Sequence, residues 1–448
     1  VIPPALLAEV ASLTEWPVAI AGSFDERYLA VPQEVLITTM QDNQKTFAVV
    51  GADGKIRPHF IAVANLESAD EAAVRKGNEK VIRPRFADAE FFWQQDLKHK
   101  LADYLPRLEH VVYQEKLGSV AAKTRRLEAL GRELAPVCGA DAENVATAAR
   151  ISKSDLLTEM VMEFPELQGL MGRYYAAAEG YAEDIAAALD EQYQPRGAGG
   201  ALPQTRTGLA LAIAEKLDTL VGGFAIGAKP TGSKDPYALR RMAISLIRLI
   251  TENELALPLA AWLDKSAAQY DAALGAPIHV AAVREYILER LDSHYREQGI
   301  RSETCQAVLA LGSDDLVDIE RRIRALDAFA GSPSATSLLA SAKRIRNILK
   351  KNGERDEAVA ADRLIEPAEQ ALWQNWQTLA PAIDAELQKS DYRAALEQLA
   401  TLGAPLDAFF TDVMVMSDDP ALQQNRLALL TTLQRGFDQI ADLSLLSE

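Results

Sequence analysis

The chain has 448 residues, of which 48% are hydrophobic and 25% charged, and its formal net charge is −17. This length favours three or four domains with sizeable cores, and no apolar run approaches the roughly 20 residues of a membrane-spanning helix. The acidic balance repels nucleic acid at long range, so any RNA contact requires a locally basic face.

Cysteine and histidine are sparse. Cys138 and Cys305 lie far apart in the sequence and fit a reducing cytoplasm rather than a disulfide scaffold. The five histidines show no spacing typical of zinc ligands, so we predict no metal site. The first residues lack the basic start and the cleavage site of a signal peptide, and Val1 in place of Met suggests a fragment or a processed chain.

The first hundred residues have the mixed pattern of an α+β domain. β-branched and aromatic residues concentrate in three segments, which we predict to be strands: Glu34–Met40, Lys45–Gly51 and Pro58–Leu66. Ala52–Lys55 separates the last two segments. It predicts a hairpin, because Gly54 tolerates a positive φ.

Helical periodicity begins after Ala69 and continues almost to the end of the chain. Ser152 and Asp155 have the spacing of a capping box ahead of a helix whose apolar residues run from Leu156 to Phe164. Glycine and proline predict three breaks, at Pro195–Gly200, Ala228–Gly232 and Gly331–Pro333.

One helix near the C-terminus is unusually basic. Each residue advances about 100° around a helix axis, so Ala342, Ile345, Ile348 and Leu349 share one side. The other side carries Lys343, Arg344, Arg346, Lys350 and Lys351, with Asn347 among them. Two interpretations stay open: a phosphate-contacting surface, or a solvated face balanced by nearby acids.

The segment Gly227–Lys234 nearly matches a phosphate-binding loop. That motif requires Lys followed by Ser or Thr after its second glycine, whereas here Ser233 precedes Lys234. The preceding segment also has a helical rather than an extended pattern. We therefore interpret the segment as a tight loop before the helix that contains Tyr237–Arg248.

The region around Asp218 resembles the HD metal-dependent phosphohydrolases, whose activity needs several His and Asp ligands. No histidine occurs between His110 and His279, so we predict a domain of that shape without its chemistry. The ATP-binding signatures of class I and class II aminoacyl-tRNA synthetases are not visible either. We assign no catalytic residues.

Seven segments, in order between residues 15 and 236, carry a family resemblance. They are Glu15–Ala19, Pro32–Leu36, Met40–Lys45, Gly77–Phe92, Glu163–Gly169, Lys216–Leu220 and Pro230–Pro236. Together they resemble the β subunit of the bacterial two-subunit glycyl-tRNA synthetase. From Lys343 to Met416 the chain also resembles the helical anticodon-binding domain shared with arginyl-tRNA synthetases.

The resemblance implies an α+β fold class that is predominantly α-helical, with four domains. We expect the remainder of an N-terminal α+β domain at residues 1–92 and a degenerate HD-like helical domain at 93–250. A helical linker domain is expected at 251–330, and a helical anticodon-binding bundle of the DALR type at 331–448. The β subunits of this family are longer at the N-terminus, so we expect the chain to be truncated there.

The resemblance further implies a glycine–tRNA ligase subunit that binds tRNA(Gly) and lacks an aminoacylation site of its own. Adenylate formation and transfer to tRNA are expected on a separate α subunit, which holds ATP and Mg²⁺, in a cytoplasmic α₂β₂ tetramer. For the chain itself the resemblance implies no cofactor, no metal, no membrane and no DNA.

Candidate tRNA contacts follow from the same resemblance. In the anticodon-binding domain they are Lys343, Arg344, Arg346, Asn347, Lys350, Arg426 and Arg435. In the HD-like domain they are Lys153, Arg173, Lys229, Lys234, Arg240 and Arg241. We expect two groups of apolar residues in the core, namely Phe409, Phe410, Val413 and Met414, and Leu427, Leu430, Leu433 and Phe437.

A second basic cluster comprises Arg75, Lys76, Lys80, Arg83 and Arg85. It predicts either an RNA contact or structural pairing with Asp88 and Glu90, and the sequence leaves both open.

Two alternatives to a tRNA-binding subunit remain. One is an HD-type metal-dependent phosphohydrolase, which the missing histidines disfavour. Gln192 and Glu215, where we expect His and Asp in the family, weaken it further. The other is a non-catalytic scaffold whose basic helix binds an acidic protein.

Overall fold

The computed structural model describes residues 2–197, 199–232, 234–270, 274 and 278–446. The chain divides into two compact units, residues 1–215 and 216–448. Helix α10 (Arg206–Ala225) runs through the boundary between the units. In the described part of the chain, no helix combines the length and the apolar composition needed to cross a membrane.

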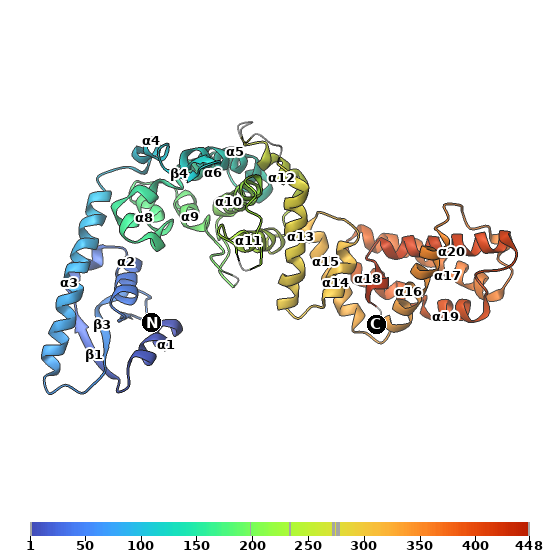
Figure 1. Cartoon of the computed structure of the whole chain (residues 1–448), viewed down its shortest axis with the longest axis horizontal. Helices are drawn as coiled ribbons and strands as arrows, with labels where there is room; N and C mark the ends of the chain where they lie inside the picture. The colour runs from blue at the N-terminus through green and yellow to red at the C-terminus, as the bar shows by residue number, and fades with distance from the viewer. Residues whose placement is uncertain (1, 198, 233, 271–273, 275–277, 447–448) are drawn as a thin grey trace. The chain divides into compact units, whose positions relative to one another are not determined.

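Unit 1 opens with a small antiparallel sheet and the helices around it (Figure 1). The elements are α1 (Pro4–Leu13), β1 (Val18–Ser23), α2 (Gln33–Thr38), β2 (Phe47–Val50), β3 (Ile56–Ala64) and α3 (Glu71–Asp96), with a 3₁₀ turn at Glu26–Ala30. The strands lie in the order β1-β3-β2. The predicted hairpin is confirmed, because Gly54 takes a φ of 76° and the Gly51 N–H donates to the Lys55 carbonyl at 2.8 Å.

The predicted strand at Glu34–Met40 is wrong, because the segment forms α2 and a π-helical turn at Thr39–Asn43. Pro32 stands at the start of α2 and has no N–H for a strand ladder. The fully buried residues follow a helical spacing: Val35, Leu36, Thr39 and Met40. The β-branched composition reflects burial of one helix face and not extended backbone.

Helix α3 lies along the sheet and carries the chain onward into the helical part of unit 1 (Figure 1). Its buried face includes Ile82 and Phe86, both at most 1% exposed. The ring of Phe86 meets that of Phe24 edge-on at 4.8 Å and that of Tyr28 at 5.6 Å, geometries that aromatic pairs prefer. The predicted α+β character of the first hundred residues is confirmed.

Asp96, at the end of α3, is a buried carboxylate with three hydrogen-bond donors. It accepts the backbone N–H groups of Glu159 at 2.9 Å and Met160 at 3.0 Å, and the Tyr175 hydroxyl at 2.6 Å. The two N–H groups belong to the first turn of a helix, where backbone donors lack intrahelical acceptors. Asp96 therefore ties α3 to the helices that follow.

The rest of unit 1 is helical apart from a short two-stranded ladder. Its elements are α4 (Leu105–Leu108), β4 (Val112–Gln114), β5 (Gly118–Ser119), α5 (Val120–Cys138), α6 (Ala142–Ile151), α7 (Glu159–Glu163), α8 (Leu170–Ala178) and α9 (Glu183–Glu191), with 3₁₀ turns at Leu101–Tyr104, Ser154–Leu157 and Pro165–Leu167.

The predicted capping box at Ser152 and Asp155 is wrong. Ser152 ends α6, and its hydroxyl donates to the Ala149 carbonyl at 2.8 Å. Thr158 is the residue that caps α7, because its hydroxyl accepts the Val161 N–H.

In the described residues of unit 2 every helix or strand element is a helix, and an isolated β-bridge joins Thr231 and Lys234. Its elements after α10 are α11 (Leu239–Thr251), α12 (Leu259–Ala267), α13 (Val280–Glu297), α14 (Ser302–Leu309), α15 (Leu316–Ala330), α16 (Ala335–Asn352), α17 (Pro367–Gln388), α18 (Tyr392–Ala400), α19 (Gly403–Asp412) and α20 (Pro420–Asp438), with 3₁₀ turns at Ala361–Arg363 and Leu443–Leu446. The three predicted breaks fall between helices. Of the residues in the breaks and in the Gly227–Lys234 loop, Ala198 and Ser233 lie outside the described residues.

The predicted C-terminal core is confirmed except at Met414. Phe409, Phe410 and Val413 are buried, whereas Met414 is 74% exposed. Helix α19 ends at Asp412 and Val413 takes extended backbone angles, so alternate side chains then point to opposite sides. The stripe of α20 is buried as predicted: Leu427, Leu430, Leu433 and Phe437.

Replacing Asp96 with Ala is expected to destabilise unit 1 by about 3 kcal/mol, because three donors, two of them in buried hydrogen bonds, lose their acceptor. Urea denaturation followed by circular dichroism measures the change. Asp88→Ala, at an exposed position of the same helix, is the control and is expected to leave stability unchanged. Equal stability of the two variants would contradict the assigned role of Asp96.

Candidate nucleic-acid interface

The predicted basic helix is α16, which begins soon after Pro333 and ends at Asn352, where it is followed by Gly353 with a φ of 81°. Its inner side packs against α19, α20 and the turn Leu443–Leu446. Ala342, Ile345 and Leu349 on this side are at most 3% exposed. Ile348, predicted for the same side, is half-buried.

The two arginines of α16 turn toward the protein. The guanidinium of Arg344 lies 4.2 Å from the centre of the Phe410 ring, and it donates to the Phe410 carbonyl at 3.5 Å. Arg346 pairs with Asp442 at 2.7 Å and Asp438 at 3.4 Å. For Arg346 the structure therefore supports the second interpretation, in which nearby acids balance the cations.

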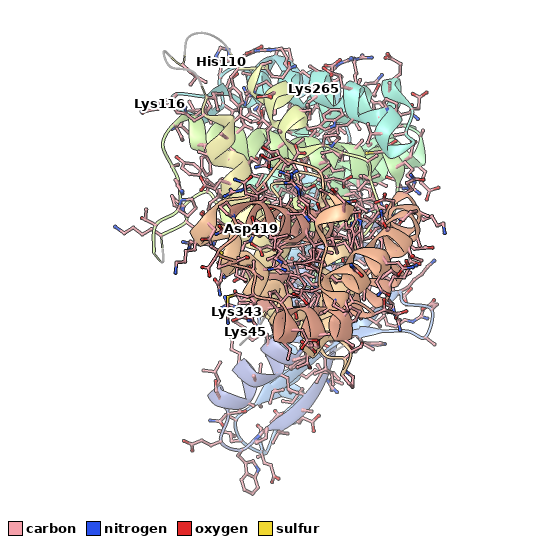
Figure 2. The ribbon with its side chains drawn as sticks, turned by 90° about the vertical axis from the view of Figure 1, so that its right-hand side faces the viewer. Lys45, His110, Lys116, Lys265, Lys343 and Asp419 are labelled. Atoms are coloured by element: carbon pink, nitrogen blue, oxygen red, sulfur yellow. The ribbon has the colours of Figure 1, made fainter. Side chains whose placement is uncertain are left out.

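The lysines of α16 face outward instead. Lys350 and Lys351 are exposed, and neither forms an ion pair with any residue that the structure describes. Lys343, labelled in Figure 2, is half-exposed. Asn347 is exposed between the lysines. For these residues the interpretation as a phosphate-contacting surface stays open.

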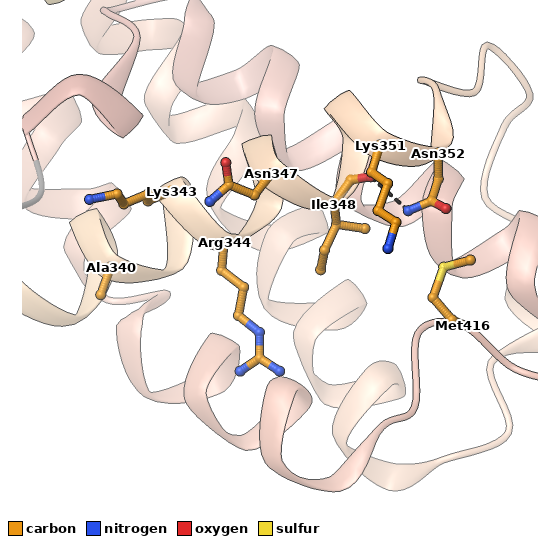
Figure 3. A pocket seen from close by; sticks show the side chains of 8 residues that line it. All are labelled: Ala340, Lys343, Arg344, Asn347, Ile348, Lys351, Asn352 and Met416. Carbon is orange, nitrogen blue, oxygen red and sulfur yellow. Dashed lines mark hydrogen bonds between the residues drawn. The ribbon is translucent and has the colours of Figure 1, made fainter.

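A shallow groove of about 710 Å³ runs along this face of α16 (Figure 3). It is lined by Ala340, Lys343, Arg344, Asn347, Ile348, Lys351 and Asn352, and by Met416 from the connection between α19 and α20. In Figure 3, Ile348, Lys351 and Met416 face one space. The groove combines cationic edges with an apolar strip.

Two other predicted contacts of the anticodon-binding region are engaged within the protein. Arg426 is 5% exposed and pairs with the fully buried Glu369 at 2.8 Å. Since a buried, paired guanidinium offers no phosphate contact, we withdraw Arg426 from the candidate surface. Arg435 is exposed but pairs with Asp356 and Glu354.

The predicted contacts of the HD-like region also divide into exposed residues and residues that are engaged within the protein. Arg173 in unit 1 is exposed, as are Lys229, Lys234 and Arg241 in unit 2. Arg240 donates to the Gly232 carbonyl at 2.6 Å and so supports the loop before α11. Lys153 is 5% exposed, and we withdraw it from the candidate surface as well.

The ammonium group of Lys153 belongs to a buried charge cluster in unit 1. Glu215 receives Lys123 at 3.1 Å on one oxygen and Lys153 at 3.4 Å on the other. Lys153 also donates to the Tyr193 hydroxyl at 3.1 Å. Burial is the main cause that lowers the pKa of Lys153, and the negative charge of Glu215 opposes it.

Asp155 lies at the edge of this cluster, and burial raises the pKa of its carboxyl to about 6. Hydrogen bonds from the Gly169 and Gly172 N–H groups and the charge of Lys153 act in the opposite direction. Both N–H groups meet the same oxygen, Oδ2, while Oδ1 is buried without a hydrogen-bond partner among the described residues. The geometry therefore suits a carboxyl that holds a proton on Oδ1.

The second basic cluster lies on α3. Its five cations, Arg75, Lys76, Lys80, Arg83 and Arg85, are exposed. None of them forms an ion pair with a described residue, and Glu90 pairs with Arg27 at 3.6 Å instead. The structure therefore does not show the predicted structural pairing with Asp88 and Glu90.

Comparison with known proteins assigns the chain to a family. A profile described as glycyl-tRNA synthetase beta subunit matches residues 1–310, which is more than half of the chain. The chain belongs to the glycyl-tRNA synthetase beta subunit family. A second profile, described as DALR anticodon binding domain, matches residues 338–443 and covers all of α16 except its first turn.

Relatives within the glycyl-tRNA synthetase beta subunit family are similar along the whole chain. The glycine–tRNA ligase beta subunit of Dichelobacter nodosus is 62% identical over 446 residues, that of Pseudomonas aeruginosa 48% over 447, and that of Acinetobacter baylyi 46% over 447. Each alignment covers 100% of this chain and 65% of the relative. The chain therefore spans about two thirds of the length of these β subunits.

Sequence reasoning missed three residues in this member of the β-subunit family. Met416 lines the groove. It points outward because α19 ends at Asp412 and the extended backbone that follows alternates its side chains, and the sequence does not show where that helix ends. Lys123 carries no sequence signal, because a lysine within a helix ordinarily lies at the surface. Lys351 lies on the predicted cationic face but is not among the candidate contacts. Among the described residues, no group of three or more His, Cys, Asp or Glu could hold a metal ion.

Asp155 is expected to make the stability of unit 1 depend on pH. Its folded pKa of about 6 exceeds its ordinary value of 3.8, so the folded state binds the proton more tightly than the unfolded state. The associated stabilisation is present below about pH 4 and is lost as the pH rises through about 6, amounting to about 3 kcal/mol.

Asp155→Asn mimics the protonated carboxyl, because its amide oxygen can accept both N–H groups. The stability gained by this variant relative to the unaltered chain is expected to grow between pH 4 and pH 7. Urea denaturation at a series of pH values measures it. A difference that stays constant over this range would show that Asp155 does not titrate there.

Proposed function

We propose that the chain is the tRNA-binding part of a glycine–tRNA ligase β subunit. It binds tRNA(Gly) and positions it for ATP-dependent aminoacylation on a separate α subunit. The observation that carries this proposal is the lysine-edged groove of α16, within the segment that matches a DALR anticodon binding domain. The names of the relatives, glycine–tRNA ligase beta subunits, support the reaction.

Local charge makes the α16 groove suitable for an RNA backbone. The whole chain is acidic, with a net charge of −17, so long-range attraction does not bring RNA to it. Lys343 and Lys351 stand along the groove, and Lys350 is exposed beside them. Lysines that meet phosphates release counterions, which makes the affinity depend steeply on salt.

The same proposal covers the remaining contacts and partners. Exposed cations of the HD-like region, Arg173, Lys229, Lys234 and Arg241, would meet other arms of the tRNA. The relatives' description as beta subunits supports an α partner, and we propose an α₂β₂ tetramer whose α subunits hold ATP and Mg²⁺. The four domains at 1–92, 93–250, 251–330 and 331–448 are part of the proposal. So is a cytoplasmic location, which the two free buried cysteines suit.

The structure disfavours the phosphohydrolase alternative, whereas the scaffold alternative needs an experiment to separate it from tRNA binding. An HD-type phosphohydrolase is less suitable, because the ammonium groups of Lys123 and Lys153 already neutralise Glu215 in the buried cluster. A scaffold that binds an acidic protein would use the same α16 lysines. Competition between tRNA and such a protein, measured at two salt concentrations, separates this alternative from the tRNA-binding proposal.

Charge reversal of the two groove lysines tests the proposal. Lys343→Glu with Lys351→Glu is expected to lower the affinity for tRNA(Gly) at least about tenfold at low salt. The dependence of log K on log salt concentration should become shallower by about 2, because each lysine that no longer meets a phosphate removes about one unit of slope. Equilibrium binding to labelled tRNA at two salt concentrations measures both quantities.

A matched control is Lys389→Glu with Arg393→Glu. Both residues are exposed and lie outside the groove lining, and the change in net charge is the same. If the control weakens binding as much as the groove variant, the effect is one of total charge and α16 does not bind the tRNA. If neither variant changes the affinity, α16 does not meet the tRNA backbone.

A further inference from the structure

Arg426 in α20 joins three segments of the C-terminal region. Its Nε donates to Glu369 Oε2 at 2.8 Å, and one terminal nitrogen lies 3.4 Å from Oε1. The other terminal nitrogen donates to the Met414 carbonyl at 2.9 Å. Glu369 also accepts the N–H groups of Ile365 and Glu366 at the start of α17. Both members of this ion pair are buried, so the pair fixes the Met414 carbonyl relative to α17 and α20.

The backbone held in this way carries one wall of the groove. Beyond α19 the side chains alternate, so Val415 is buried and Met416 is 42% exposed. Met416 stands two residues beyond the Met414 carbonyl and lines the groove together with Ile348. The Gln423 amide lies 3.5 Å from its sulfur and supports the same placement. Arg426 therefore acts on the groove through Met416 without reaching it.

The groove has the chemistry of a site for one unstacked nucleobase. Met416 and Ile348 offer apolar contact for a flat ring, and a thioether is favourable beside an aromatic system. Asn347 is exposed, and its amide can both donate and accept at a base edge. Lys343 and Lys351 flank this strip, at places suited to the phosphates on either side of the base. Unstacked bases of this kind occur in single-stranded RNA loops.

We propose that the groove between α16 and Met416 binds a single unstacked base of the tRNA, and that Arg426 is the positioning residue that shapes it through the Met414 carbonyl. This inference rests on the proposed tRNA-binding function. It gives the buried Arg426–Glu369 pair a part in base discrimination and none in phosphate binding.

The test compares binding of the full chain to tRNA(Gly) and to the same tRNA with its anticodon replaced. Met416→Ala and Arg426→Lys are each expected to lower the affinity for tRNA(Gly) about three- to tenfold and to reduce the preference for the native anticodon. Lysine keeps the positive charge but lacks the planar fork that meets Glu369 and the Met414 carbonyl together. The double variant is expected to bind no more weakly than either single variant, because both changes remove the same wall.

Two readouts separate positioning from a direct or a general effect. The salt dependence is expected to be unchanged in Arg426→Lys and in Met416→Ala, since every lysine that meets a phosphate is still present. Met414→Ala is the matched control, because Met414 is exposed beside the groove but does not line it. It is expected to bind like the unaltered chain, and Met416→Leu is expected to retain most of the affinity.

Each contrary result has a distinct meaning. Unchanged affinity of Met416→Ala would overturn the base site and leave tRNA binding in place. Additive effects in the double variant would overturn the action of Arg426 through Met416. Absence of tRNA binding by the unaltered chain, at low salt and with an α subunit added, would overturn the proposed function together with this inference. Met416→Ala changes an exposed side chain, so the test does not depend on Arg426→Lys folding.

Discussion

A carboxylate that leaves water must meet hydrogen-bond donors or a cation, and this constraint decides how helices are connected in both units. Asp96 at the end of α3 accepts two N–H groups from the first turn of α7 and the Tyr175 hydroxyl from α8. Glu191 accepts the N–H groups of Gln204 and Thr205 and so holds the start of α10. Glu369 does the same for α17 and adds Arg426. In each case a buried carboxylate fixes where a helix begins, in addition to apolar packing.

The arginines and the lysines of α16 differ in what they contact. Its arginines contact neighbouring side chains: the planar guanidinium of Arg344 stacks on Phe410, and that of Arg346 bridges Asp438 and Asp442. Its lysines lie on the outward side of the helix, and Lys350 and Lys351 are exposed there, where a compact ammonium is strongly hydrated. Three of the five cations of α16, the lysines, therefore face outward. Because the rest of the chain is acidic, an anionic partner is attracted only close to this lysine face.

Much of the architecture could be predicted from local signals. Gly54 correctly predicted the hairpin. The spacing of the apolar residues in α16 and α20 correctly predicted which face of each helix is buried. The prediction failed where tertiary contacts override composition, as in α2, whose β-branched residues are buried on a helix. At the site, the sequence showed where cations gather but not which are engaged. The role of Arg426 depends on Glu369, which is 57 residues away in the sequence. The role of Met416 depends on where α19 ends. Neither fact has a local signal in the sequence.

Helix α20 also reaches back to the long connection between α16 and α17. Asn425 exchanges two hydrogen bonds with the backbone of Ala360, at 2.8 and 3.0 Å, and the Thr431 hydroxyl accepts the Arg355 N–H at 3.1 Å. An exposed connection would ordinarily tolerate changes of length during evolution. Here an insertion between Arg355 and Ala360 would pull one of them away from its partner on α20. This stretch should therefore vary in sequence far more than in length.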